Sequence, residues 1–280
     1  MAQARSDLQA LLRSVDAAGP NDNYRDVVMH LGPRLLNETR FEVFGRECQL
    51  AEVEVYYYSD RHPDIFANCH QVQSTFGSWY LHRMGSGLKN GTYKGLDFTF
   101  GNGETFGGVL IRSLRTPDGA VVSGPSLCVD YIMAAGEVES VHDLDRQIGQ
   151  REIWDDENPV RLVPREKSDE AVYCSPRVGL TLGKLPVDDR KKQFILRPYR
   201  SLLAPREIKK GRVQLFLSLH LLGFEFEEIS RITGSPLRKI QEYADFVEQG
   251  ASHDIESLVG TLGSKELCLL AGALMNAWNE

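Results

Sequence analysis

Residues 50–58 constrain the fold more than any other part of the chain, because their pattern predicts a strand with two unlike faces. Glu52, Glu54, Tyr56 and Tyr58 alternate with the residues Val53, Val55 and Tyr57. β-branched and aromatic residues favour strands, and alternate side chains of a strand point to opposite faces. We therefore expect one apolar face that packs in a core, and one face that carries two carboxylates between aromatic rings.

The carboxylate face has two interpretations. Acidic side chains on an edge strand commonly face water and prevent aggregation. Carboxylates beside aromatic side chains also suit a pocket that stacks a flat ring and performs acid–base chemistry next to it. The rest of the sequence bears on the choice.

The bulk properties describe an ordinary globular protein of 280 residues with a formal net charge of −7. No apolar run approaches the roughly 20 residues that span a bilayer, and the polar N-terminal segment lacks the apolar stretch of a signal peptide. We expect no membrane partner and a cytoplasmic location, associated with the nucleoid if the protein is bacterial. The five cysteines are widely spaced and include no C-x-x-C pair, which argues against a disulfide framework and a zinc ribbon.

Charge is distributed unevenly along the chain. Residues 177–212 contain eleven basic side chains and three acidic ones, a net charge of +8, whereas residues 136–157 carry −6. Net acidity is unfavourable for a nucleic-acid-binding protein, but a segregated basic segment can attract an anionic ligand to one face. The alternative is that these are solvated faces whose charges happen to cluster.

Hydrophobic periodicity and turn residues predict an α+β fold with two domains, 1–211 and 212–280. An Asn102-Gly103 dipeptide between aromatic residues predicts a hairpin, and Gly124-Pro125 predicts a helix start. No Gly-x-Gly-x-x-Gly loop or repeated strand–helix–strand unit is present, which argues against a Rossmann or P-loop enzyme. The expected elements are helices over 6–15, 24–36 and 124–135, and strands over 41–58 with a turn near 45, 98–106 as the hairpin, 108–114, 171–182 and 192–198.

The C-terminal domain is expected to be helical. Helices are predicted over 213–222 and 225–232, another with Ser235 as its N-cap, and a last one over 264–278. Two short helices joined by Thr-Gly-Ser have the outline of a helix-turn-helix, whose second helix can enter a major groove. Acidic side chains at 225, 227, 228, 242 and 245 oppose phosphate binding. These helices are therefore expected to bind DNA or a protein partner, or to pack as an appendage.

A set of short motifs occurs along the chain in a recognisable order: Glu54-Val-Tyr56, His62-Pro-Asp64, the hairpin at Gly101, Val109-Leu-Ile-Arg112-Ser-Leu114, Ser123-Gly-Pro-Ser-Leu-Cys128, Arg177-Val-Gly179 and Phe194-Ile-Leu-Arg197. Over about residues 24–205 this order resembles the alkyladenine (3-methyladenine, methylpurine) DNA glycosylases. The resemblance implies a curved, mostly antiparallel sheet with flanking helices. It also implies an enzyme that flips a modified base out of double-stranded DNA and hydrolyses its N-glycosidic bond, without a metal or cofactor.

The resemblance assigns roles on the carboxylate face. Breaking the bond builds positive charge on the sugar while water attacks, so a carboxylate near C1′ both activates water and stabilises that charge. Glu54 takes this catalytic role, and Tyr56, about 7 Å along the strand, forms one wall around the base with Tyr58 beyond it. Arg112 is expected to have a carboxylate, water or phosphate partner; alternatively it belongs to a buried structural ion pair. No lysine stands out as a Schiff-base nucleophile, so we expect hydrolysis without a lyase step.

A histidine loop follows the strand. His62 and His70 are both candidates for the pocket histidine, and we favour His62 as the catalytic one because Asp64 could orient it. Asp64 and His70 are then expected to contact the substrate. Cys69 beside these residues matches no standard zinc spacing, so no metal site is predicted.

The hairpin departs from the family pattern. Phe100 aligns with the wedge that fills the space of the flipped nucleotide, with Asn102 beside it. Asp97 stands where the family has a second stacking tyrosine, and glycines 107 and 108 stand where it has a guanine-excluding asparagine. The resemblance further places Arg177, Arg197 and Arg200 at the DNA.

These departures imply a roomier and more polar pocket. We therefore expect a bulky or hypermodified base, such as a glucosylated base of phage DNA, as the substrate, and a role in antiviral defence. The alternatives are base-excision repair of alkylated purines, a non-enzymatic helix-turn-helix regulator, and an enzyme acting on RNA or nucleotides.

Overall fold

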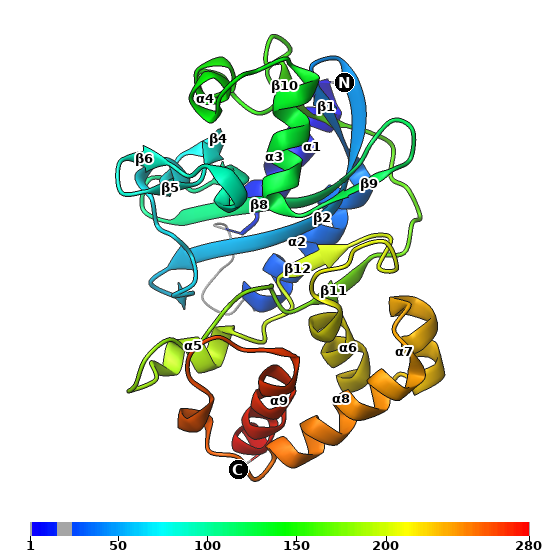
Figure 1. The fold of residues 1–280 in the computed structure, drawn as a ribbon. Helices are drawn as coiled ribbons and strands as arrows, with labels where there is room; N and C mark the ends of the chain where they lie inside the picture. The colour runs from blue at the N-terminus through cyan, green and yellow to red at the C-terminus, as the bar shows by residue number, and fades with distance from the viewer. Residues whose placement is uncertain (1, 16–23, 280) are drawn as a thin grey trace. The chain divides into compact units, whose positions relative to one another are not determined.

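The computed structural model describes residues 2–15 and 24–279. The chain divides into two compact units. Unit 1 contains residues 1–63, 67–172 and 200–203, and unit 2 contains residues 64–66, 173–199 and 204–280. The fold is α+β, with a large antiparallel sheet and flanking helices (Figure 1).

Unit 1 is built on the sheet, whose main path runs in the order β10-β1-β2-β8-β7-β4. All of the pairings along this path are antiparallel. The elements of this unit are α1 (Ala2–Arg13), α2 (Tyr24–Glu38), β1 (Thr39–Val43), β2 (Arg46–Ser59), β3 (His62–Pro63), η1 (Gln71–Ser74), β4 (Phe76–Leu81), β5 (Arg83–Met84), β6 (Gly87–Leu88), η2 (Gly91–Tyr93), β7 (Leu96–Phe100), β8 (Phe106–Arg115), β9 (Val121–Ser123), α3 (Pro125–Ala135), α4 (Val141–Ile148), β10 (Val160–Pro164) and β12 (Arg200–Leu202).

The long strand β2 has the two faces that its sequence predicts. Val53, Val55 and Tyr57 are buried, and helix α2 packs on this side. Gly32 of α2 approaches Ser201 and Val53 so closely that a Cβ there would lie 2.3 Å from the Ser201 hydroxyl. Tyr24 at the start of α2 stacks on Tyr57, with 6.1 Å between ring centroids. The apolar face of β2 is therefore part of the core of unit 1.

Helix α3 packs against β8 and β9 (Figure 1). It begins at Pro125, directly after Gly124, whose φ of 125° is one that residues with a side chain rarely adopt. Cys128 on this helix is buried. Burial raises the pKa of its thiol; the charge of Glu52 raises this pKa further, and the charge of Arg112 lowers it. Helix α3 therefore lies over the end of the charged face.

Several predicted elements are confirmed, and three are wrong. The strands around residue 45, the hairpin at 101–103 and the helix from Pro125 all form. The strand expected over 171–182 forms only at Tyr173–Ser175. No strand was expected within residues 59–90, but β3, β4, β5 and β6 form there; the apolar segment Phe76–Leu81 is short and lies between stretches rich in His, Gly and polar residues. Residues 192–198 were expected to be a strand; instead Asp188 caps the short helix α5 (Asp189–Phe194) through its bond from the Arg190 N–H.

Unit 2 contains the C-terminal helices and a segment that precedes them. Buried Leu182, Val187 and Ile195 share one apolar cluster with Leu258 and Leu270. This shared core explains why residues 173–199 group with the tail, in contrast to the expected boundary at 211 and 212. The elements are β11 (Tyr173–Ser175), α5, α6 (Arg212–Leu221), α7 (Phe226–Thr233), α8 (Leu237–Gly250), η3 (Ile255–Leu258) and α9 (Ser264–Asn279).

The helix-turn-helix outline corresponds to α7 and α8. Gly234 ends α7 in the left-handed conformation, with φ of 68°. The N-cap position of α8 is Pro236, and the predicted N-cap Ser235 lies one residue earlier. None of the described helices combines the length and apolar character needed to cross a bilayer.

Candidate active site

The candidate site is a row of side chains that crosses the sheet of unit 1. In the strand register, Arg200 lies opposite Glu54, Glu54 opposite Leu110, Leu110 opposite Asp97, and Asp97 opposite Tyr80. Directly opposed residues of antiparallel strands point to the same face. The strands β12, β2, β8, β7 and β4 therefore bring two carboxylates, an arginine and a tyrosine to one side of the sheet.

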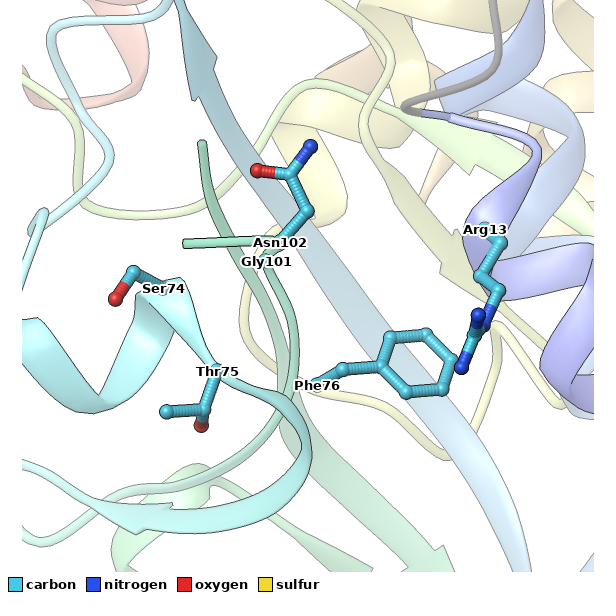
Figure 2. A pocket seen from close by; sticks show the side chains of 6 residues that line it. All are labelled: Arg13, Ser74, Thr75, Phe76, Gly101 and Asn102. Carbon is cyan, nitrogen blue, oxygen red and sulfur yellow. The ribbon is translucent and has the colours of Figure 1, made fainter. Parts of the chain in front are cut away.

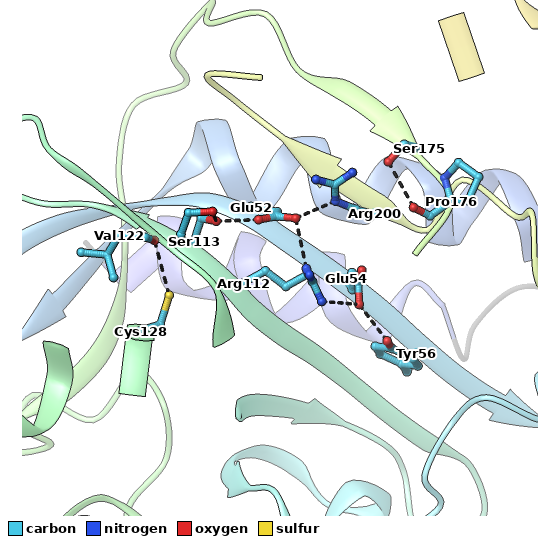
Figure 3. Close-up of polar contacts among 11 residues, drawn as sticks. Glu52, Glu54, Tyr56, Arg112, Ser113, Val122, Cys128, Ser175, Pro176 and Arg200 are labelled. Atoms are coloured by element: carbon cyan, nitrogen blue, oxygen red, sulfur yellow. Dashed lines mark hydrogen bonds and ion pairs between the residues drawn. The ribbon is translucent and has the colours of Figure 1, made fainter. Parts of the chain in front are cut away.

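Glu52 is the centre of a buried charge network at one end of this row (Figure 3). Its Oε1 accepts from Arg112 Nε at 3.0 Å and from Arg200 Nε at 2.6 Å, and its Oε2 accepts from the Ser113 hydroxyl at 2.5 Å. Burial by itself raises the pKa of Glu52, but the charges of Arg200 and Arg112 outweigh it and lower the pKa below its usual value. Glu52 is therefore a structural anion that holds two arginines.

Glu54 is fully buried and lies next to this network. Its Oε2 accepts from the Tyr56 hydroxyl at 2.8 Å and from Arg112 at 3.3 Å (Figure 3). Arg112 thus bridges the two glutamates; burial by itself lowers the pKa of its guanidinium, but Glu54 and Glu52 raise it above its usual value. Of the partners left open for Arg112, the structure shows carboxylates, those of Glu52 and Glu54, and this is also the buried ion pair that was the alternative. Two register irregularities near Glu52 in the pairing of β2 with β8 let Arg112 reach both acids.

Asp97 forms a second polar group in the row, with two partners that the sequence did not indicate. His82 Nε2 lies 2.8 Å from Asp97 Oδ1, and Gln73 Nε2 donates to Oδ2 at 3.0 Å. Burial by itself lowers the pKa of His82, but the charge and hydrogen bond of Asp97 raise it above its usual value. The spacing Tyr80-x-His82, which repeats the Glu54-x-Tyr56 spacing, is the signal that could have identified His82.

The glycines of β8 do not enlarge the site. A Cβ at Gly108 would lie 2.9 Å from Gln73 Nε2, and a Cβ at Gly107 would lie 2.6 Å from the Phe100 ring. The prediction of a roomier pocket from these glycines is therefore wrong, because the Gln73 amide and the Phe100 ring occupy the space. The more polar character expected from Asp97 is retained.

The preferred histidine lies on the other face of the sheet. His62 is buried against Tyr57, with 5.6 Å between ring centroids, and its Nδ1 lies 2.9 Å from the Tyr57 carbonyl. Since Tyr57 points away from Glu54, the assignment of His62 to the catalytic site is not supported. His70 instead lies 5.0 Å from the ring of Tyr80, the residue opposite Asp97. Its Nδ1 accepts the Val72 N–H and caps η1, and burial lowers its pKa.

Phe100 cannot act as a wedge in this conformation. It is fully buried and stacks on Tyr57 with 5.9 Å between ring centroids. The two-residue period of β7 places Phe100 on the same face as Phe98, and this face packs in the core. Tyr58, in contrast, is partly exposed at the end of β2 and meets Phe106 edge to face.

Asn102 lies at the tip of the hairpin, on a surface pocket of about 380 Å³ (Figure 2). Its Oδ1 accepts the N–H groups of residues 104 and 105, both at 2.9 Å. Across the pocket the guanidinium of Arg13 lies 4.5 Å from the centroid of the Phe76 ring. The pocket therefore presents one arginine and one amide to solvent.

Two of the expected DNA-binding arginines are buried in ion pairs. Arg177 holds Asp64 through two hydrogen bonds of 2.6 and 3.0 Å, and both side chains are fully buried. Arg200 is bound to Glu52. The predicted contacts of Arg177 and Arg200 with DNA, and of Asp64 with the substrate, are therefore wrong. Arg197 remains partly exposed, and its Nε donates to the Gln193 carbonyl.

Within the described ranges, no group of three or more His, Cys, Asp or Glu side chains is placed to hold a metal ion. The sequence matches no model of a known protein family and no curated protein.

Proposed function

We propose that the chain is a monofunctional DNA N-glycosylase, which flips a modified base out of duplex DNA and hydrolyses its N-glycosidic bond to leave an abasic site. The observation that carries the proposal is the surroundings of Glu54. A fully buried carboxylate receives hydrogen bonds from Tyr56 and Arg112, within the Glu-x-Tyr strand and the Val-Leu-Ile-Arg strand whose order resembles the alkyladenine DNA glycosylases. Two elements far apart in sequence thus supply one acid–base centre.

The chemistry follows from these contacts. As the bond to the base breaks, positive charge develops on the sugar and a carboxylate stabilises it. Glu54 supplies this charge and accepts a proton from the attacking water. Arg112, fixed on the other side by Glu52 at 3.0 Å, keeps Glu54 in place. Tyr56, partly exposed, offers its ring to the flipped base.

The neighbouring Asp97 and His82 favour a substrate with polar groups on the base. An apolar or aromatic wall would stack any purine, whereas a carboxylate and an imidazole form hydrogen bonds. Bulky or hypermodified bases of phage DNA fit this polarity, and antiviral defence is the role that we propose. Repair of alkylated purines is the alternative, and it is tested by measuring base release from DNAs that carry alkylated purines.

The proposed DNA contacts lie at both ends of β4. Met84 at the turn of the β5–β6 hairpin is 80% exposed and two residues from His82, so we assign to it the wedge role in place of Phe100. Arg13 and Asn102, on the pocket near Phe76 at the other end of β4, are proposed to contact a backbone phosphate. Arg197 stays a proposed DNA contact.

The test is release of bases from DNAs that carry different modifications, followed by alkali to break the strand at abasic sites. Glu54→Gln is expected to abolish release and to keep DNA binding, because the amide cannot accept the proton of water. Glu47→Gln on the same strand, where Glu47 is exposed and paired with Arg40, is the matched control and should retain activity. If the wild-type protein releases no base from any DNA, the proposal is overturned. If it binds DNA without releasing any base, and Glu54→Gln leaves that binding unchanged, the alternative function is favoured. In that alternative the protein is a non-enzymatic regulator that binds DNA through the helix-turn-helix formed by α7 and α8.

A further inference from the structure

A hydrogen-bonded chain of three side chains lies on the same face of the sheet as Glu54, with Leu110 of β8 between Glu54 and Asp97 in the strand register. Gln73 accepts the His70 N–H through Oε1 at 3.2 Å, which directs its Nε2 to Asp97. Asp97 is thereby fixed, and its other oxygen lies 2.8 Å from His82 Nε2. The imidazole is therefore held through one nitrogen by a buried carboxylate, which is the arrangement that orients a histidine for proton transfer.

The surroundings of His82 favour its protonated form. Asp97 is its hydrogen-bonded partner, and Glu54 adds negative charge, whereas Lys89 opposes it and Tyr80 packs at 5.9 Å between ring centroids. The ring lies on Gly95, where a Cβ would be 2.6 Å from Nδ1, so only glycine admits it. The His82 side chain is 26% exposed, while Asp97 is buried. His82 is therefore the member of this chain that can exchange protons with solvent.

We propose that His82 is the general acid of the N-glycosylase reaction and protonates the departing base; this inference rests on the proposed function. The bond between C1′ and the base nitrogen breaks, and its electron pair goes to the base. The imidazolium gives its proton to that base, while water adds to C1′ and passes a proton to Glu54. The products are the neutral free base and an abasic site; His82 then regains a proton from solvent, and Glu54 releases its proton to solvent.

This role determines the substrate class. A neutral base is a poor leaving group until it is protonated, so it needs an acid. A base that already carries a positive charge, such as 7-methylguanine, leaves without a proton and is repelled by an imidazolium. We therefore expect the site to act on uncharged modified bases and to discriminate against cationic alkylated purines.

The experiment compares single-turnover release of an uncharged base and of 7-methylguanine by wild type, His82→Gln and Glu54→Gln. For the uncharged base, His82→Gln should lower the rate on the order of 10²- to 10⁴-fold. The slow release of 7-methylguanine, which needs no acid, should change less than about threefold. Glu54→Gln should lose both reactions. His142→Gln, which removes an exposed imidazole from α4, is the control and should keep the preference for uncharged bases.

The pH profile separates catalysis from structure. The wild-type rate on the uncharged base should fall as pH rises through the pKa of His82, and Asp97→Asn should move this fall to lower pH because the group that raises the pKa is removed. Equal losses on both substrates, or an unchanged pH profile in His82→Gln, would overturn the assignment of His82 while leaving the glycosylase proposal intact. Release of 7-methylguanine alone by the wild type would also overturn it. No release from any DNA would remove the proposed function itself.

Discussion

Glu52 and Glu54 lie two positions apart on one strand, yet their surroundings give them different roles. Both carboxylate oxygens of Glu52 accept hydrogen bonds, from two arginines and a serine hydroxyl, so its role is structural. Glu54 is held by Arg112 and Tyr56, and Tyr56 is partly exposed. The difference between the structural carboxylate Glu52 and the proposed catalytic carboxylate Glu54 thus depends on which arginines reach each of them.

Glu52 should make the stability of the protein depend on pH in the acidic range. Its pKa is lowered in the folded state, so its contribution is present above its unfolded pKa, near 4.5, and is lost as pH falls through the lower folded value. Glu52→Gln leaves Arg112 and Arg200 without their common anion and should cost about 3–5 kcal/mol at neutral pH. Urea unfolding measured from about pH 7 to about pH 3 should show this difference shrinking with acid. Glu47→Gln serves as the exposed control, and curves that stay parallel at all pH values would contradict the prediction.

At the scale of elements, β4 and the β5–β6 hairpin link the site to the surface. Tyr80, His82 and Met84 occupy alternate positions, and their exposed fractions rise from 1% for the Tyr80 residue to 26% for the His82 side chain and 80% for the Met84 residue. The chain thus passes from the sheet to solvent within five residues. An exposed apolar side chain at that point suits contact with the stacked bases of a duplex.

Met84→Ala is expected to slow base release from a fully paired duplex, on the order of tenfold, because the vacated space in the stack is no longer filled. Release from a mismatched target, which is already unstacked, should change much less. Single-turnover rates on the two duplexes measure the effect. Leu127→Ala, which removes an exposed apolar side chain from α3, is the control. Equal rates for Met84→Ala and wild type on the paired duplex would contradict the wedge role.

At the scale of the whole molecule, the segregation of charge in the sequence overstates the positive surface. In the basic segment, Arg177 and Arg200 are buried, and Arg190 and Lys192 pair with the neighbouring acids Asp188 and Asp189. With a net charge of −7, the proposed binding to DNA depends on a few specific cations. Arg13, which lies on the pocket with Asn102, is proposed as one of them.

Arg13→Ala should weaken DNA binding at low salt and reduce the slope of log K against log salt by about 1, because one phosphate contact is lost. The measurement is a fluorescence-anisotropy titration at several salt concentrations. Arg151→Ala is the control, since Arg151 is an exposed arginine paired with Glu157. A slope that is unchanged in Arg13→Ala, or reduced equally in both variants, would exclude this pocket as a phosphate site.

The sequence by itself determined the features that depend on local rules. The alternation of residues 50–58 fixed the two faces of β2, Asn102-Gly103 fixed a hairpin, and Gly124-Pro125 fixed a helix start. Local pattern also predicted that Glu54 and Tyr56 share a face, and that Arg112 needs a partner. These features follow from the two-residue period of a strand and from the backbone preferences of glycine and proline.

Only the tertiary structure decided which distant side chains meet. Strand register placed His82 and Gln73 on Asp97, turned Phe100 and His62 to the core face, and filled the space beside Gly108. Side-chain packing likewise joined Arg177 to Asp64, residues that are 113 positions apart in the chain. A sequence specifies alternation within each strand, whereas the register between strands depends on the packing of the whole core.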